Sequence, residues 1–111
     1  MEHATKIRAL NDAFRKDPIR REGELVVTSG IVNLGQEAFA EIMCLVQDFD
    51  AFTPDNDPYG EHDFGSFTYD MHLINWKFDY YSDKQKEWGS EAPYDPAKCY
   101  RVLTVMLARE Y

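Results

Sequence analysis

The chain has few cysteines, no long apolar run and no basic excess, and each shortage argues against a class of protein. Cys44 and Cys99 are the two cysteines of its 111 residues. They lie far from any CxxC spacing within apolar helical patterns, so two buried, reduced thiols are expected rather than a disulfide or a metal pair. No run approaches the roughly 18 apolar residues of a membrane span, and the first residues lack a signal-peptide pattern. We therefore expect a protein of the cytoplasm without a membrane partner.

Length and composition predict one folded domain over residues 1–111. The chain is long enough to bury a single modest core. Hydrophobic residues make up 44% of it, including seven Phe, seven Tyr and two Trp. This composition is typical of a folding chain and not of a disordered one.

Acidic residues dominate the charge, and they are unevenly placed. The net charge is −8, and residues 48–95 alone contain twelve acidic residues against three basic ones. Contacts to phosphate need a basic patch, so this part of the chain is not expected to bind nucleic acid directly. A basic protein partner, a cation or simple solubility would each account for the acidic excess.

Hydrophobic spacing predicts six elements in the order α-β-α-β-β-α. The fold class is α+β, and a three-stranded antiparallel sheet packed with helices is the simplest way to bury the apolar faces. The hairpin turn is expected near Asp70 to Leu73, although no Asn-Gly or Asp-Gly pair marks it. One helix is expected over residues 4–16, with Ile7, Leu10 and Phe14 on one face. A strand is expected over residues 24–34, and a second helix follows Gln36 and frays near Phe52. The hairpin is expected within residues 65–81, where one strand has Phe67, Tyr69 and Met71 on one face and the next has Ile74, Trp76, Phe78 and Tyr80. The last helix is expected to run from Pro96 almost to the C-terminus.

Short motifs mark where these elements begin and bend. Gly30 inside the first strand suggests a bulge. Asn33 followed by Gln36 has the spacing of a capping box at the start of the second helix. Asp95 before Pro96 is typical of the N-cap and first position of a helix. The buried face of that last helix is then expected to hold Cys99, Val102, Leu103, Met106 and Leu107.

The most unusual segment is FTPDNDPYGEHDFG, residues 52–65, which we call the acidic stretch. It is not an EF-hand, because a calcium loop begun at Asp55 would place Tyr59 and Ser66 where carboxylate ligands are needed. The simplest interpretation is that Asp55 and Asp57 cap turns through side-chain hydrogen bonds. Its prolines restrict the backbone, so we expect a rigid, exposed connector.

A metal site is an alternative interpretation of the same segment. Glu61, His62 and Asp63 offer oxygen and imidazole ligands, and Asp79 is the natural further ligand. Adjacent residues of a strand point to opposite faces, however, so at most Glu61 and Asp63 would converge. We favour no metal, with His62 at the edge of the core.

No pattern in the sequence indicates catalysis. There is no GxSxG motif, and both cysteines are expected on buried faces, where a thiolate is disfavoured. His62 with a carboxylate partner could act as a general base, but the other two histidines add no constellation. We predict neither catalytic residues nor a cofactor.

Two aromatic residues suggest a surface for a protein partner. Tyr81 lies on the polar face of its strand, and Trp88 lies in a charged connector, where exposed aromatics often anchor interfaces. Alternatively, Trp88 folds back over the edge of the sheet. The expected partner-binding residues are Asp55, Asp57, Glu61, Asp63, Asp79, Tyr81, Asp83, Glu87, Trp88 and Glu91.

The acidic stretch, WKFDYY (76–81) and GSEAPYDPAKCYRVLTVMLAREY (89–111) together resemble a family of small, uncharacterised bacterial proteins with a domain of unknown function. The resemblance covers the chain from about residue 5 to its end. This chain departs from the family at the Asp70-Met71-His72 turn and in the Lys84-Gln85-Lys86 region. The family occurs largely in alphaproteobacteria, often on plasmids and other mobile elements, and has no established catalytic residues. The resemblance therefore implies a small, acidic accessory protein of mobile DNA.

Charge and resemblance together lead to a functional hypothesis. CRISPR effectors and nucleases hold nucleic acid in basic channels. We expect a non-enzymatic inhibitor of a host defence complex, of anti-CRISPR or anti-restriction type, whose acidic face binds such a basic surface. One alternative is a small divalent-metal-dependent enzyme built on the cluster from Asp55 to Asp63. Another is an accessory subunit of an unknown complex.

Overall fold

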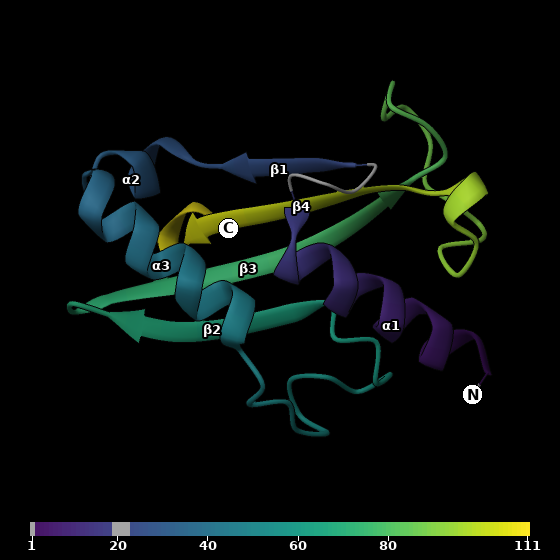
Figure 1. Cartoon of the computed structure of the whole chain (residues 1–111), viewed down its shortest axis with the longest axis horizontal. Coiled ribbons are helices and arrows are strands. Elements are labelled where there is room, and N and C mark those ends of the chain that lie inside the picture. Colours follow the sequence, from purple (N-terminus) through teal and green to yellow (C-terminus); the bar gives the residue numbers. More distant parts are fainter. Residues whose placement is uncertain (1, 19–22) are drawn as a thin grey trace.

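The computed structural model of the protein describes residues 2–18 and 23–111, which form an α+β fold as predicted (Figure 1). The sheet has the strand order β1-β4-β3-β2. The strands and helices in chain order are α1 (Glu2–Lys16), β1 (Glu24–Val27), α2 (Ser29–Val32), α3 (Gln36–Asp48), β2 (Phe64–Tyr69), β3 (His72–Tyr81) and β4 (Tyr100–Leu107). Two short 3₁₀ turns, η2 (Pro96–Lys98) and η3 (Ala108–Glu110), flank β4.

The predicted three-stranded antiparallel sheet is wrong, because the sheet has four strands and is mixed. β1 pairs with β4 in parallel, whereas the β4–β3 and β3–β2 pairs are antiparallel. The additional strand is β4, which lies between β1 and β3 at the centre of the sheet.

The segment expected to be the last helix forms this central strand. Asp95 does cap a helical turn, since its Oδ1 accepts a hydrogen bond from the Ala97 amide at 2.9 Å, but the turn ends at Lys98. Residues 100–107 are apolar on both faces, and such a run does not reveal whether it is a buried strand or a buried helix. The buried residues of β4 are Arg101, Val102, Leu103, Val105, Met106 and Leu107.

The first strand is shorter than predicted. β1 ends at Val27, and residues 29–32 form the short helix α2. Gly30 therefore lies in a helix and not at a bulge. Its amide donates to the Glu110 carboxylate at 3.1 Å, and a Cβ at this position would lie 2.6 Å from a carboxylate oxygen. The contact with the C-terminal turn η3 thus favours the helical conformation of Gly30, which the local sequence does not specify.

The second long helix is where it was expected, but it begins differently. Asn33 is the C-cap of α2, and Gly35, with φ of 104°, is the N-cap of α3 without a side-chain hydrogen bond. The predicted capping box is therefore absent. Cys44 lies on the exposed side of α3, contrary to prediction, whereas Cys99 is buried, and both are free thiols.

The hairpin of β2 and β3 is confirmed, with its turn at Asp70 and Met71. Both turn residues have positive φ, 46° and 70°, which matches the twist of a two-residue hairpin. Met71 is 96% exposed, so it does not share a buried face with Phe67 and Tyr69 as predicted. The predicted inner face of β3 is confirmed, and it consists of Ile74, Trp76, Phe78 and Tyr80.

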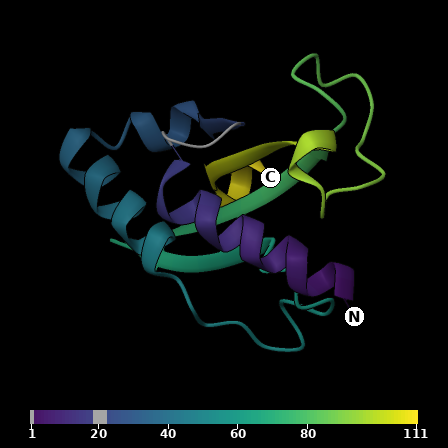
Figure 2. The same ribbon diagram turned by 45° about the vertical axis from the view of Figure 1, so that its right-hand side comes forward.

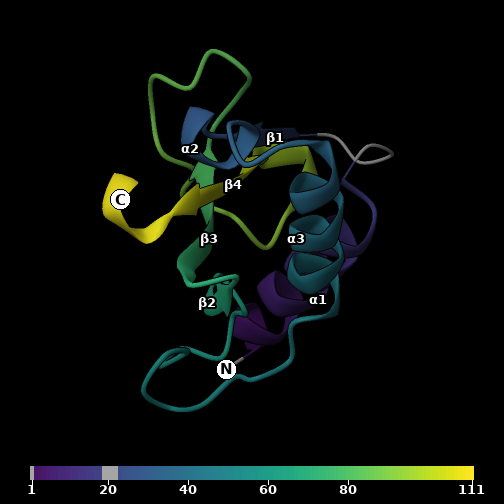
Figure 3. The same ribbon diagram turned by 90° about the vertical axis from the view of Figure 1, so that its left-hand side faces the viewer.

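Helices α1 and α3 cover one face of the sheet, and the C-terminal turn lies on the other side (Figure 3). The core between helices and sheet is centred on the fully buried Trp76, which meets Phe49, Phe52 and Phe78 in edge-to-face contacts. No helix among residues 2–18 and 23–111 is long and apolar enough to cross a membrane. The two-layer arrangement places α1 against the acidic stretch, where the polar networks form.

Candidate functional site

The buried face of α1 carries polar as well as apolar side chains. Ile7 and Phe14 are buried as the spacing predicts, but Asn11 and Arg15 on the same face are also buried, at 0% and 2% exposure. Buried polar groups need partners, and each of these two organises a network that contacts the acidic stretch. A polar residue at an apolar position of the helix is the sequence signal that marks both of them.

Arg15 links α1 to the end of α3. Its Nη1 donates to the carbonyl oxygens of Val46 and Phe49 at 2.7 and 2.8 Å, and its Nη2 donates to Asp12 at 3.3 Å. The guanidinium also lies over Trp76, 4.7 Å from the ring centroid. Burial lowers the pKa of Arg15, yet a guanidinium stays charged in proteins. Arg15 therefore supplies the positive charge that favours the carboxyl end of α3.

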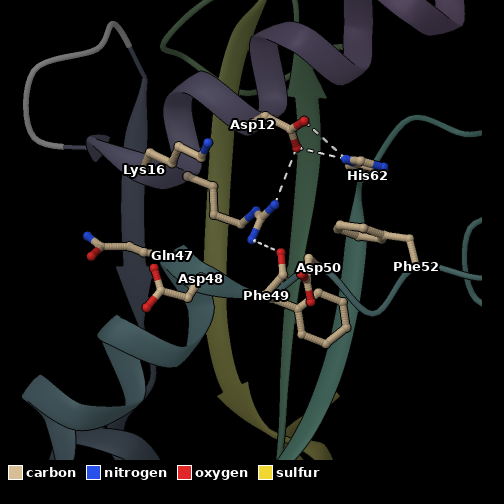
Figure 4. A pocket seen from close by; sticks show the side chains of 9 residues that line it. Asp12, Lys16, Gln47, Asp48, Phe49, Asp50, Phe52 and His62 are labelled. Carbon is tan, nitrogen blue, oxygen red and sulfur yellow. Dashed lines mark hydrogen bonds and ion pairs between the residues drawn. The ribbon is translucent and has the colours of Figure 1, made fainter.

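His62 connects the acidic stretch to α1 (Figure 4). Its Nδ1 lies 2.9 and 3.1 Å from the two carboxylate oxygens of Asp12, and its Nε2 lies 3.7 Å from Asp57. The ring stacks flat on Phe52 at 3.7 Å. Because both ring nitrogens face carboxylates, the geometry suits a structural link better than a general base. The φ of 54° at His62 shows that this placement is held by its surroundings.

A cavity of about 470 Å³ opens beside this link, between α1 and the end of α3. Figure 4 shows Asp12 and Lys16 on the α1 side and Asp48 and Asp50 on the α3 side. The walls thus carry both signs of charge, and Arg15 in the floor is already engaged. The cavity suits water or a small polar molecule and selects neither anions nor cations.

Asp57 has a structural role within the acidic stretch. It is 9% exposed, and its Oδ1 accepts hydrogen bonds from the backbone amides of Glu61 and His62 at 3.0 and 3.1 Å. The predicted capping role is thereby confirmed for Asp57, which adds nothing to an exposed acidic face. Asp55 is exposed, and it is Asn56 beside it that closes a turn with Thr53.

A second network, centred on Arg101, joins five segments of the chain. Arg101 is 4% exposed, and its Nε donates to the side-chain oxygen of Asn11 at 2.7 Å. Its Nη2 donates to the Pro93 carbonyl. The Asn11 amide donates in turn to the Tyr80 hydroxyl at 2.8 Å and to the Glu61 carbonyl at 3.1 Å. Burial lowers the pKa of Arg101 and raises the pKa of Tyr80.

Glu61 and Asp63 are half-buried carboxylates, and none of the described residues forms an ion pair with either of them. Burial, followed by the neighbouring carboxylates Asp63 and Asp57, raises the pKa of Glu61. Burial and Asp57 likewise raise the pKa of Asp63 against the effect of a backbone hydrogen bond. Arg101 only partly offsets the charge of Glu61, and His62 only partly offsets that of Asp63. The acidic stretch therefore holds negative charge that the described residues do not fully neutralise.

Residues 82–95, which we call the Trp88 loop, project from the end of β3 (Figure 2). Toward the end of the loop, Tyr94 stacks on His3 of α1 with ring centroids 3.7 Å apart. The loop is fixed to the end of β3, since the Ser82 amide donates to the Trp88 carbonyl at 2.8 Å and the Ser90 amide donates to the Tyr80 carbonyl at 3.0 Å. Trp88 is 74% exposed. It therefore does not fold back over the sheet. The predicted acidic residues of this loop, Asp83, Glu87 and Glu91, are also exposed.

The acidic stretch and the Trp88 loop each form a backbone hydrogen bond to the same edge of β3. The carbonyl of Asp63 accepts from the Phe78 amide at 2.9 Å, and the carbonyl of Tyr80 accepts from Ser90. Phe78 and Tyr80 are two residues apart, so these contacts are separated by about 7 Å along the strand. The end of the acidic stretch and the base of the Trp88 loop are therefore neighbours on β3, while the rest of the stretch and the tip of the loop extend in opposite directions, downward and upward in Figure 1.

Asp79 and Tyr81 belong to a different surface. Side chains alternate along a strand, so both lie on the face opposite the inner residues Phe78 and Tyr80. Asp79 is paired with Lys77 at 2.6 Å. The alternative metal set of Glu61, His62, Asp63 and Asp79 therefore does not converge. Among all the residues that the structure describes, no three His, Cys, Asp or Glu side chains are grouped to hold a metal ion.

One family model matches the chain, and its description is "Protein of unknown function (DUF3768)". The match spans residues 27–110 and so includes the acidic stretch, the Trp88 loop and three of the four strands. The chain belongs to the DUF3768 family. This confirms the resemblance to a domain of unknown function. Helix α1 lies outside the DUF3768 match, although it supplies Asp12 and Arg15 to the first network and Asn11 to the second. No curated protein and no solved structure matched the chain.

Proposed function

We propose that the protein is a small, non-enzymatic interaction protein of the cytoplasm that binds a basic surface of another protein. The observation that carries this proposal is the Trp88 loop, in which a 74% exposed Trp is held on a fixed backbone. Tryptophan is enriched among the residues that dominate binding energy. Because the backbone is already ordered, little entropy is lost when Trp88 is buried by a partner.

The surroundings of Trp88 favour a basic partner. Asp83, Glu87 and Glu91 are exposed in the same loop, and such a rim steers and selects positively charged surfaces. A hollow of about 620 Å³ beside Trp88 is lined in part by Glu91 and Tyr94. An arginine side chain can stack on an indole and pair with a carboxylate at once, and this hollow offers both groups.

The acidic stretch supports the same class of partner. The pKa values of Glu61 and Asp63 are raised. Their ionised carboxylates therefore make the folded protein less stable when no partner is bound. Local features that reduce stability are typical of functional surfaces. A bound cationic side chain would neutralise this charge, and a partner that spans this edge of β3 would contact both segments, because both are attached there.

A nucleic-acid-binding defence complex is the partner class that we propose. CRISPR effectors and restriction enzymes present basic channels in which phosphates lie, and carboxylates can occupy such positions. The resemblance to proteins of mobile elements supports an anti-CRISPR or anti-restriction role, because those elements are targets of these complexes. An accessory subunit of another complex would use the same surface with a different partner.

Competition with DNA is the direct test. A purified CRISPR effector or restriction enzyme is loaded with fluorescent DNA and titrated with the protein, and displacement of the DNA is expected. Trp88→Ala should raise the off-rate from the effector, as loss of a buried anchor does. Tyr111→Ala is the matched control, since Tyr111 is similarly exposed, at 76%, but follows the opposite end of β4. Equal binding of the two variants would refute the role of Trp88.

The acidic face has its own test. Glu61→Gln, Asp63→Asn, Glu87→Gln and Glu91→Gln together should slow association and flatten its salt dependence, because exposed charges act within about 8 Å at physiological ionic strength. If the combined variant associates as fast as the parent across a salt series, the acidic surface serves solubility alone.

A metal-dependent enzyme would behave differently in a thermal melt. An ion at about 100 times its dissociation constant adds roughly 2.7 kcal/mol of stability. We expect Mg²⁺, Mn²⁺ and Zn²⁺ each to shift the melting temperature by no more than about 2 °C, because the candidate ligands do not converge. A large shift that a chelator reverses would support the enzyme instead.

A further inference from the structure

The β2 edge of the sheet presents backbone groups that no described residue satisfies. The Phe78 amide donates to the Asp63 carbonyl, and the register places Gly65 opposite Trp76. Hydrogen-bonded pairs alternate in an antiparallel ladder, so the amides and carbonyls of Ser66 and Thr68 point away from β3. Both residues are exposed. An edge of this kind is a template for another strand.

The other edge of the sheet is protected, whereas β2 is not. β1 has four residues, and its Glu24 is held by Lys86 at 3.0 Å. Short strands, charges and prolines are the usual protection of an edge, and β2 (FGSFTY) has neither a charged residue nor a proline. In Figure 1 the acidic stretch lies beside the beginning of β2, and the outer edge of β2 pairs with no other described strand.

Charge on the helix side of this edge is negative, whereas Lys77, opposite Phe64, and Arg109, beside Leu73, lie toward the other face. Residues 22–76 contain eleven acidic residues and no Lys or Arg. Asp63 and Asp70 flank β2 at its two ends, and Glu41 on α3 accepts a hydrogen bond from the Tyr69 hydroxyl at 2.7 Å. That bond and the nearby carboxylates raise the pKa of Tyr69 to about 12. A second copy of the chain would bring like charges together, since antiparallel pairing of two β2 strands places Asp63 of one copy near Asp70 of the other.

We propose that the β2 edge binds an extended, basic segment of a partner protein by strand addition. The backbone of the segment bonds to the free amides and carbonyls of Ser66 and Thr68. Its basic side chains lie on the helix side of the sheet, toward Glu41. The side chains of the segment that alternate with the basic ones lie on the sheet face opposite the helices. They are apolar, because Leu73 is 52% exposed on that face beside Thr68. This surface is separate from the Trp88 loop and does not depend on the role proposed for that loop.

The test uses the full chain and a synthetic peptide of alternating lysine and valine. We expect the peptide to protect the amides of Ser66 and Thr68 from hydrogen exchange. Thr68→Pro removes an outward amide and should weaken binding about fivefold or more, as expected for the loss of an intermolecular hydrogen bond. Thr68→Ala retains the amide and should bind as the parent does. A peptide with glutamate in place of lysine should not bind.

Several results would overturn this inference. One is the absence of protection at Ser66 and Thr68 in the parent, a measurement that does not depend on whether Thr68→Pro folds. Another is equal binding of the lysine and glutamate peptides, which would remove the basis for a basic partner. A parent that sediments as a dimer, with Thr68→Pro monomeric, would assign the edge to a second copy of the chain.

Discussion

Arg15→Met tests whether a buried cation from α1 holds the end of α3 in place. Arg15 is 2% exposed and donates to the carbonyls of Val46 and Phe49 at the last turn of the helix. Methionine keeps most of the apolar contact with Trp76 and removes the donors. The two carbonyls then lose their charged hydrogen-bond donor.

The expected loss is about 3 kcal/mol of unfolding free energy. A hydrogen bond to a charged group contributes about 1.5–3 kcal/mol, and Arg15 makes two of them to carbonyl oxygens. The desolvation of the guanidinium, which the substitution removes, offsets part of this sum. A loss of about 3 kcal/mol corresponds to a decrease of roughly 12 °C in Tm for a domain of this size.

Urea denaturation followed by circular dichroism measures the change, and Lys16→Met is the matched control. Lys16 is the neighbouring cation on α1 but is exposed, so its loss should change stability by less than about 0.5 kcal/mol. Arg15→Lys should fall between the parent and Arg15→Met, because an ammonium does not reproduce the two-pronged geometry. If Arg15→Met is as stable as the parent, the proposed capping of α3 by α1 is wrong.

Three further predictions concern packing and pH. Gly65→Ala should lose about 1–3 kcal/mol in urea denaturation, because its Cβ would lie 2.3 Å from the Trp76 indole nitrogen, whereas Gly89→Ala, with its nearest atom at 3.7 Å, should be near neutral. The pKa of Glu110 is lowered, chiefly by the hydrogen bond from Thr28, so the Tm advantage of the parent over Glu110→Gln should be complete above pH about 5 and disappear as acid protonates the carboxylate. The pKa of Asp63 is raised, so Asp63→Asn should melt higher than the parent at pH 7 and lose that advantage below pH about 4. A variant that is no more stable than the parent at pH 7 would contradict the burial of this charge.

The comparison of sequence and structure shows which signals were sufficient. The helices α1 and α3 and the β2–β3 hairpin follow from the periods of their apolar residues, since each buries one face and exposes the other. β4 does not follow, because a central strand is apolar on both faces and its pattern fits a helix equally well. The predicted number of strands and their antiparallel pairing were wrong because this one segment forms a strand and not a helix.

Some features of the candidate surfaces follow from the sequence, and others depend on the tertiary structure. The acidic stretch and Trp88 stand out in the sequence by composition. That Asp57 is buried while Glu61 and Asp63 carry unneutralised charge depends on which backbone amides each side chain meets. The sequence did not indicate the roles of Asn11, Arg15 and Arg101, because their hydrogen-bond partners lie in distant segments. Asn11 and Arg101, for example, bond to each other and are 90 residues apart.

The sequence by itself determined the α+β class, the acidic middle of the chain and the positions of the periodic elements, because composition and period are local properties. The tertiary structure places residues 100–107 at the centre of the sheet, leaves β2 as an open edge, and attaches both the acidic stretch and the Trp88 loop to the same edge of β3. Each of these depends on pairing between segments far apart in the chain, and a hydrogen-bond ladder or a buried ion is stabilised only once its distant partner is in place.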